Sequence, residues 1–115
     1  MRSESPAKLL RIHLSEGDRE EGHPLYEIIV ARCRELKIAG ATVFRGLEGY
    51  GVSAELHRSH VMRHDQPIVI TVVDTAENVA RLVTEIEAIT DSAVMVVSDV
   101  TAVRVQKQPD THPAG

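Results

Sequence analysis

The segment from Pro67 to Asp74 constrains the fold more than any other part of the sequence. It reads PIVITVVD, so apolar or β-branched residues occupy both alternating sets of positions along it. A strand with two apolar faces is stable only where both faces are covered, as in the middle of a layered structure. The sequence therefore predicts a central strand here, with other structure on each side of it.

Two helices and further strands are predicted from the period of the apolar residues, which is two in strands and 3.6 in helices. Before the central strand we expect a strand at Ala7–Leu14, a helix from Pro24 to about Lys37 and a strand at Ala41–Arg45. After it we expect a helix through Ile89, which opens with a capping-box-like Asp74 and Glu77. The chain then continues with two strand pieces, Ala93–Val97 and Val100–Val105, separated by Ser98 and Asp99.

This order, β-α-β-loop-β-α-β, is the split pattern of the α+β ferredoxin-like fold. Such a fold has a four-stranded antiparallel sheet with both helices on one face. The second apolar face of the central strand would then be bare in a monomer. Another copy of the same sheet is the least demanding cover for it, so we expect self-association.

Length and composition fit one soluble domain. The 115 residues are 43% hydrophobic and 26% charged, and we expect a single domain with an ordered core at about 7–105 and a frayed tail at 108–115. The formal charge of −4 comes without a long basic run, so nucleic acid is not an expected partner. Neither a signal peptide nor a membrane helix is evident, which indicates a cytoplasmic protein.

The strongest candidate for a ligand site is the start of a long loop, about Gly46 to Gln66. Arg45 directly precedes the loop, which opens with Gly46 and continues with Gly49 and Gly51 on either side of Tyr50. Glycines can leave backbone N–H groups free to approach an anion, and the arginine supplies charge for a phosphate or carboxylate. The alternative is that the glycines only turn the chain out of the strand.

Two other clusters carry chemistry-bearing residues. His57, His60 and His64 are spaced so that a metal site is conceivable, although neighbouring arginines favour solvated loop residues. The acidic stretch after the first strand suits acid–base chemistry or Mg²⁺, or is a solvated turn. We expect the solvated turn, and keep Asp18 as a candidate ligand contact.

Three stretches of the sequence resemble a known family. The sequence resembles the GlnB-like (PII-like) family of unknown function from about Leu9 to Val105. The resemblance is carried by Pro24–Tyr26, Ile38–Gly46 and Gly49–Gly51. That family is a distant relative of the nitrogen regulatory protein PII. The resemblance implies a ferredoxin-like homotrimer whose open sheet faces meet around a central axis.

The same resemblance implies ligand clefts between subunits. In PII-like proteins these clefts usually hold adenine nucleotides, and the long loop, here 46–66, touches a partner. Some relatives accompany small membrane transport proteins, so a transporter is the expected partner. Thr90 and Asp91 fall at a turn next to the cleft and are further ligand candidates.

The expected function is therefore that of a signalling protein that binds a small effector, with an adenine nucleotide as the expected one. Nucleophile-elbow, Walker, Rossmann and zinc-protease patterns are missing from the sequence, so we do not expect an enzyme. Two alternatives stay open. One is a small-molecule enzyme with an active site at a subunit interface, and the other is a trimer that binds divalent metal ions.

Overall fold

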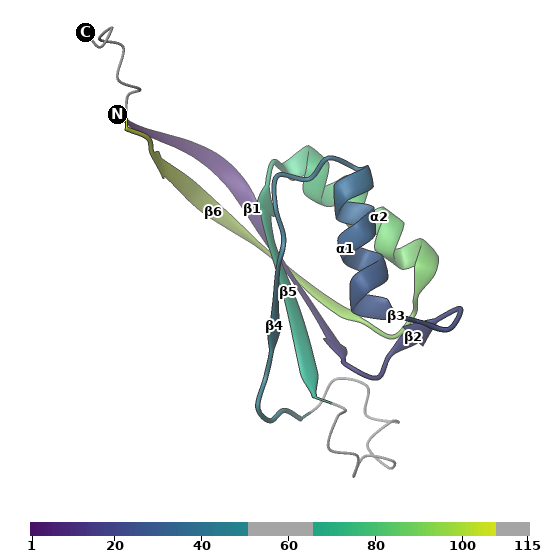
Figure 1. Ribbon diagram of the computed structural model, residues 1–115. Coiled ribbons are helices and arrows are strands. Elements are labelled where there is room, and N and C mark those ends of the chain that lie inside the picture. The colour runs from purple at the N-terminus through teal and green to yellow at the C-terminus, as the bar shows by residue number, and fades with distance from the viewer. Residues whose placement is uncertain (51–65, 108–115) are drawn as a thin grey trace, which may run out of the picture.

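The computed structural model describes residues 1–50 and 66–107 and contains two layers (Figure 1). An antiparallel sheet has the strand order β4-β5-β1-β6, and helices α1 and α2 lie on one of its faces. This is the α+β ferredoxin-like arrangement that the order of elements predicts. The elements are β1 (Arg2–Ser15), β2 (Arg19–Glu20), β3 (His23–Pro24), α1 (Leu25–Glu35), β4 (Thr42–Arg45), β5 (Pro67–Asp74), α2 (Ala76–Ile89) and β6 (Val94–Val105).

The hydrophobic core lies between the sheet and the two helices. Every second residue of β1 and β5 points towards the helices, as the pleat of a strand requires. These side chains meet apolar residues that recur three or four positions apart along each helix. The buried set is Leu10, Ile12, Leu14, Ile68, Ile70 and Val72 from the strands, and Leu25, Ile29, Cys33, Val79, Leu82 and Ile86 from the helices.

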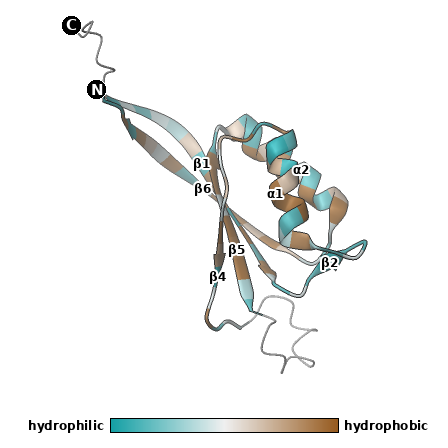
Figure 2. Cartoon of the chain, viewed as in Figure 1, coloured by the Kyte–Doolittle hydropathy of each residue, from teal (hydrophilic) through white to brown (hydrophobic). Residues whose placement is uncertain are grey.

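The opposite face of the sheet is open and carries many apolar side chains, together with Arg11 and His13 of β1. β4 and β5 are strongly hydrophobic along most of their length (Figure 2), although the helices cover only one side of them. Phe44 is 54% exposed, and Val73, Val94 and Val96 are also exposed. Phe44 pairs with Val69 on β5, and Val69 lies on the face of that strand away from the core. The central strand thus has the two apolar faces that its sequence predicts.

Two strand predictions are corrected by the pairing of β1 with β6. β1 begins at Arg2 rather than Ala7, and β6 is one continuous strand rather than two pieces. The expected break at Ser98 and Asp99 is absent because both residues continue the pairing with β1, opposite Leu9 and Lys8, and Asp99 also forms an ion pair with Lys8. The first residues of β1 pair only with β6, so the two strands extend beyond the helices as a two-stranded ribbon (Figure 1).

Helix α1 ends two residues earlier than its sequence pattern predicts. Glu35 is its last residue, and Lys37 has a positive φ of 62°. The Lys37 N–H donates to the Arg34 carbonyl at 3.1 Å, and the Ile38 N–H donates to the Cys33 carbonyl at 3.0 Å. These two bonds form a Schellman motif, in which glycine ordinarily occupies the left-handed position.

The predicted capping box of α2 is wrong by one residue. Thr75 is the N-cap, and its hydroxyl accepts a hydrogen bond from the Asn78 N–H at 3.1 Å. Asp74 lies just before the cap and has a wider role. Its carboxylate accepts from the N–H of Ala39 at 2.9 Å and of Thr75 at 2.7 Å, so it ties the segment after α1 to the start of α2.

The acidic stretch after β1 is not a plain loop. Arg19 and Glu20 pair with His23 and Pro24 to form a small hairpin. Its two-residue turn consists of Glu21 and Gly22, which both have positive φ, at 53° and 82°. Two positive φ values in succession are typical of the tight turns that match the twist of a hairpin.

Candidate functional site

The base of the long loop lies at one end of the sheet. Arg45 is the last residue of β4, and the strand pairing places it opposite Ile68. Pro67 is the first residue of β5 and lies opposite Ser15, the last residue of β1. Three strand ends therefore meet where Arg45, Gly46 and Gly49 are located. Gly51, His57, His60 and His64 were also predicted as candidates, and they lie outside the described residues.

Gly46 and Gly49 pack against the ring of Pro67. A Cβ atom at Gly46 would lie 2.8 Å from the Pro67 Cγ, and one at Gly49 would lie 2.9 Å from it. The Gly46 N–H also donates to the Pro67 carbonyl at 2.7 Å. These contacts explain both glycines by close packing, because no side chain fits there. Tyr50 beside them is almost fully exposed.

Arg45 forms an ion pair that no local sequence pattern predicts. Its Nη2 donates to the Glu16 Oε2 at 2.7 Å, and the two residues are 29 positions apart. The hydrogen bond and the charge of Glu16 raise the pKa of the Arg45 guanidinium above its ordinary value. Arg45 is half exposed, so its guanidinium is a fixed positive charge at the surface of the loop base.

Asp18 is nearly buried in the connection between β1 and α1. It is 8% exposed, and its Oδ2 accepts a hydrogen bond from the Ser15 N–H at 2.9 Å. Its backbone carbonyl accepts from the Leu25 N–H at 2.8 Å. These contacts give Asp18 a structural role in the connection between β1 and α1.

Thr90 and Asp91 lie at the far edge of the sheet from Arg45. They follow α2 and precede β6, whereas Arg45 ends β4, and these two strands are the opposite edges of the sheet. Three inter-strand spacings separate the edges, which amounts to about 14 Å. Within one chain the structure therefore groups Arg45, Gly46 and Gly49, and it leaves Thr90 and Asp91 apart.

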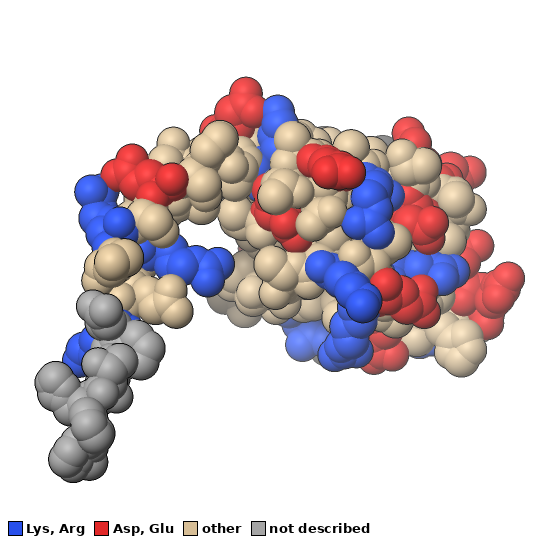
Figure 3. Space-filling view, turned by 90° about the horizontal axis from the view of Figure 1, so that it is seen from above, with Lys and Arg blue, Asp and Glu red and all other residues tan. Residues whose placement is uncertain are grey.

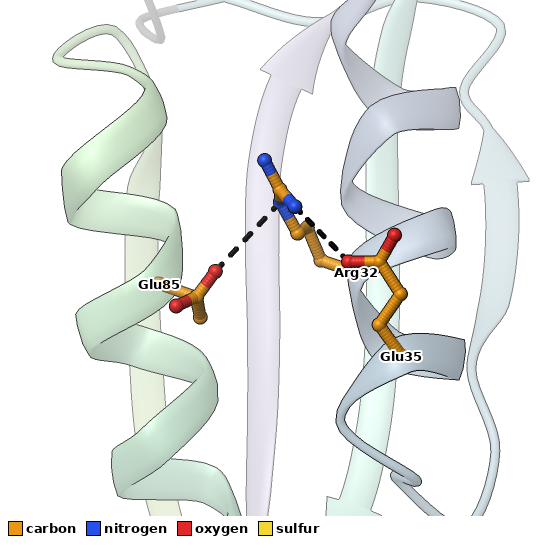
Figure 4. A network of polar contacts seen from close by, with 3 residues as sticks. All are labelled: Arg32, Glu35 and Glu85. Atoms are coloured by element: carbon orange, nitrogen blue, oxygen red, sulfur yellow. Dashed lines mark hydrogen bonds and ion pairs between the residues drawn. The ribbon is translucent and has the colours of Figure 1, made fainter.

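A hollow of about 300 Å³ lies beside the β2–β3 hairpin. It is lined by Glu20, Glu21 and His23 of the hairpin region, Ile28 and Arg32 of α1, and Ala88 and Ile89 of α2. Arg32 joins the helices, since its Nη1 lies 3.0 Å from Glu35 and its Nε lies 3.7 Å from Glu85 of α2 (Figure 4). The guanidinium is thereby engaged by carboxylates of the protein itself.

Charges of both signs are intermixed on the face shown in Figure 3. Among residues 1–50 and 66–107, no group of three or more His, Cys, Asp and Glu is placed to hold a metal ion. Burial raises the pKa of the Cys33 thiol, so the thiolate that nucleophilic chemistry needs is disfavoured. Within the same residues no helix is long and apolar enough to cross a membrane.

The fold is that of PII-like proteins. The apo form of CPII, a nitrogen regulatory PII-like protein from Thiomonas intermedia K12, is similar to this chain with a TM-score of 0.63 and 22% identity. The match covers 91% of this chain and 100% of CPII. A structure of CPII bound to ADP, AMP and acetate matches with a TM-score of 0.56 and 26% identity, over 87% of this chain and 91% of CPII.

The chain belongs to the DUF190 family, described as "Uncharacterized ACR, COG1993", whose profile matches residues 7–102. A UPF0166 protein of Aquifex aeolicus (strain VF5) is 39% identical over 82 residues, which is 70% of this chain and 78% of the relative. The UPF0166 protein MJ1524 of Methanocaldococcus jannaschii is 35% identical over 98 residues, which is 81% of this chain and 88% of the relative. The resemblance found in the sequence is confirmed.

Proposed function

We propose that this protein is a PII-like regulator that binds an adenine nucleotide at the loop base around Arg45. The observation that carries the proposal is the exposed guanidinium of Arg45 at the base of the long loop. An arginine there can donate two hydrogen bonds to a phosphate. The nucleotides bound to CPII, which has the same fold, support adenine nucleotides as the ligand class.

The proposed site is completed by a neighbouring subunit. The open apolar face of the sheet favours self-association, and a homotrimer is the assembly proposed. β4 ends and β6 begins at the same end of the sheet, because they run in opposite directions. A rotation axis parallel to the strands would bring Arg45 of one subunit towards Thr90 and Asp91 of the next. A ligand cleft between subunits would use both candidate groups.

The remaining parts of the proposal concern signalling. The protein acts in the cytoplasm, without catalysis of its own, and its loop at 46–66 contacts a membrane transport protein. The position of the proposed ligand site supports this, because Arg45 and Gly46 lead directly into that loop. A ligand at the loop base is well placed to change what the loop presents to a partner.

Calorimetry with ADP and AMP tests the proposal, with Arg45→Gln as the variant. Loss of a charge-assisted hydrogen bond to phosphate should weaken ADP binding at least about tenfold. Arg104→Gln, near the far end of β6 from the proposed site, is the matched control and should bind like the wild type. Unchanged affinity in Arg45→Gln would refute the proposed site.

Two further measurements distinguish the regulator from the two alternatives, an enzyme with an interface active site and a metal-binding trimer. Release of phosphate or adenosine during incubation with ADP would indicate an enzyme. Zinc that remains bound after dialysis, together with stabilisation by zinc and none by nucleotides, would indicate the metal-binding trimer. Nucleotide binding without turnover supports the regulator.

A further inference from the structure

Glu16 occupies the position where an anionic ligand would bind Arg45. Its Oε2 accepts from the Arg45 Nη2 at 2.7 Å, a distance typical of a charge-assisted hydrogen bond. The Glu16 side chain is 24% exposed and that of Arg45 is 54% exposed. The carboxylate is thus the more enclosed partner, and the guanidinium reaches it from the more open side.

The backbone fixes Glu16 in this place independently of its side chain. The Glu16 N–H donates to the Gln66 carbonyl at 2.7 Å, beside the pairing of Ser15 with Pro67. Asp18 further holds the turn through the Ser15 N–H. Glu16 therefore contacts both described ends of the long loop, Arg45 through its carboxylate and Gln66 through its backbone.

We propose that Glu16 is an internal competitor for Arg45, which sets how tightly the site binds its anionic effector. This inference rests on the proposed function, because it requires that the effector uses Arg45. An anion that binds the guanidinium must displace the Glu16 carboxylate or bind beside it against like-charge repulsion. Either route weakens binding. Where the effector displaces Glu16, it also breaks the side-chain contact between β4 and the end of β1.

The size of the effect follows from the exposure of the pair. Exposed ion pairs change an equilibrium by no more than about fivefold, so a phosphate can displace Glu16 at a modest loss of affinity. Substitution of Glu16 by glutamine removes the competing charge and keeps the backbone bond to Gln66. The structure thus predicts that removal of the Glu16 charge beside the ligand site makes effector binding tighter, whereas substitutions beside a ligand site usually weaken binding.

The test is ADP titration of Glu16→Gln at low ionic strength, where screening of the pair is weakest. We expect binding about two- to fivefold tighter than that of the wild type. Glu20→Gln is the matched control, because it removes the same charge from β2 and should bind like the wild type. In an Arg45→Gln background, the gain from Glu16→Gln should be smaller than in the wild type, since the residue that Glu16 competes for is gone.

Each other outcome counts against the inference. Weaker binding in Glu16→Gln would mean that Glu16 holds Arg45 in position for the ligand, and unchanged binding would mean that the two do not compete. Equal gains in Glu16→Gln and Glu20→Gln would mean a general effect of charge. Glu16→Asp, with a shorter side chain, should change affinity in the same direction as Glu16→Gln if the glutamine variant folds poorly.

The two proposals fail in distinguishable ways. If the wild type binds ADP and Glu16→Gln binds no tighter, only the competitor role is refuted. If neither protein binds ADP or AMP, the proposed function fails and the competitor role fails with it.

Discussion

Lys37 adopts a backbone conformation that ordinarily belongs to glycine. Its φ of 62° places an L-residue in the left-handed region, where the Cβ approaches the backbone. The two Schellman bonds around it hold the residue there. The end of α1 therefore carries a small and removable strain.

The variant Lys37→Gly should raise the free energy of unfolding by about 1 kcal/mol, because glycine adopts positive φ without that strain. Urea unfolding followed by circular dichroism measures the change. Arg34→Gly, one turn earlier in ordinary helical backbone, is the control and should lower stability by about 1 kcal/mol. A loss of stability in Lys37→Gly would contradict the strain argument.

At the scale of elements, Asp74, at the end of β5, joins the start of α2 to the segment after α1. Burial acts to raise the pKa of Asp74. The pKa nevertheless lies below its ordinary value, because hydrogen bonds and a nearby positive charge outweigh the effect of burial. The donors are the N–H groups of Ala39 and Thr75 and the side chain of Asn78, and the charge is that of Arg81. The ionised carboxylate is thus favoured in the folded protein.

This shift predicts how stability depends on pH. Because the folded pKa lies below the unfolded value of about 3.9, the contribution of Asp74 is complete above that value and is lost as the pH falls through the folded pKa. Asp74→Asn should be less stable than the wild type at pH 7, and the difference should shrink below about pH 4. Urea unfolding between pH 2.5 and 7 measures it. Asp91→Asn, on the exposed turn after α2, is the control for the loss of a carboxylate as such.

Elements were predictable from the sequence where local pattern decides them. β5 has the predicted bounds, because its apolar run is bounded by Pro67 and Asp74 and needs no other information. For β6 the sequence predicts two strand pieces separated by Ser98 and Asp99, which is wrong. Lys8, which lies opposite Asp99 in the sheet, is 91 positions away in the sequence.

The candidate site shows the same limit. Arg45 stood out by its position before the glycines, whereas the carboxylate that engages it, Glu16, looked like one of several solvated acids. Periodicity and turn chemistry report on neighbours along the chain, and they carry no information on pairs that only the folded sheet brings together.

At the scale of the whole molecule, the open sheet face is the proposed interface between subunits. Phe44, Val73, Val94 and Val96 are exposed apolar side chains on strands whose other face is the core. A carboxylate at Phe44 should dissociate the proposed trimer, because Phe44 lies opposite Val69 and the face would have to bury an unpaired charge there. The monomer should still fold, since the core lies on the other side of the sheet.

Light scattering after size-exclusion chromatography measures this for Phe44→Asp. Val105→Asp introduces the same charge at the end of the ribbon, at a side chain already 78% exposed, and should remain associated like the wild type. A trimeric Phe44→Asp protein would show that the open face is not the interface.

The ribbon of β1 and β6 also determines how the molecule responds to force. The register of the two strands continues to Met1 and Gln106, whose backbones exchange hydrogen bonds at 2.9 Å. A force applied between these two residues acts across the strands, so it breaks the inter-strand hydrogen bonds one after another from the tip of the ribbon. A force that shears β1 past β5 along the strand direction would instead load all of their hydrogen bonds at once. The fold is therefore weak in one direction of tension and strong in the other, and the end that opens first is the one farthest from Arg45.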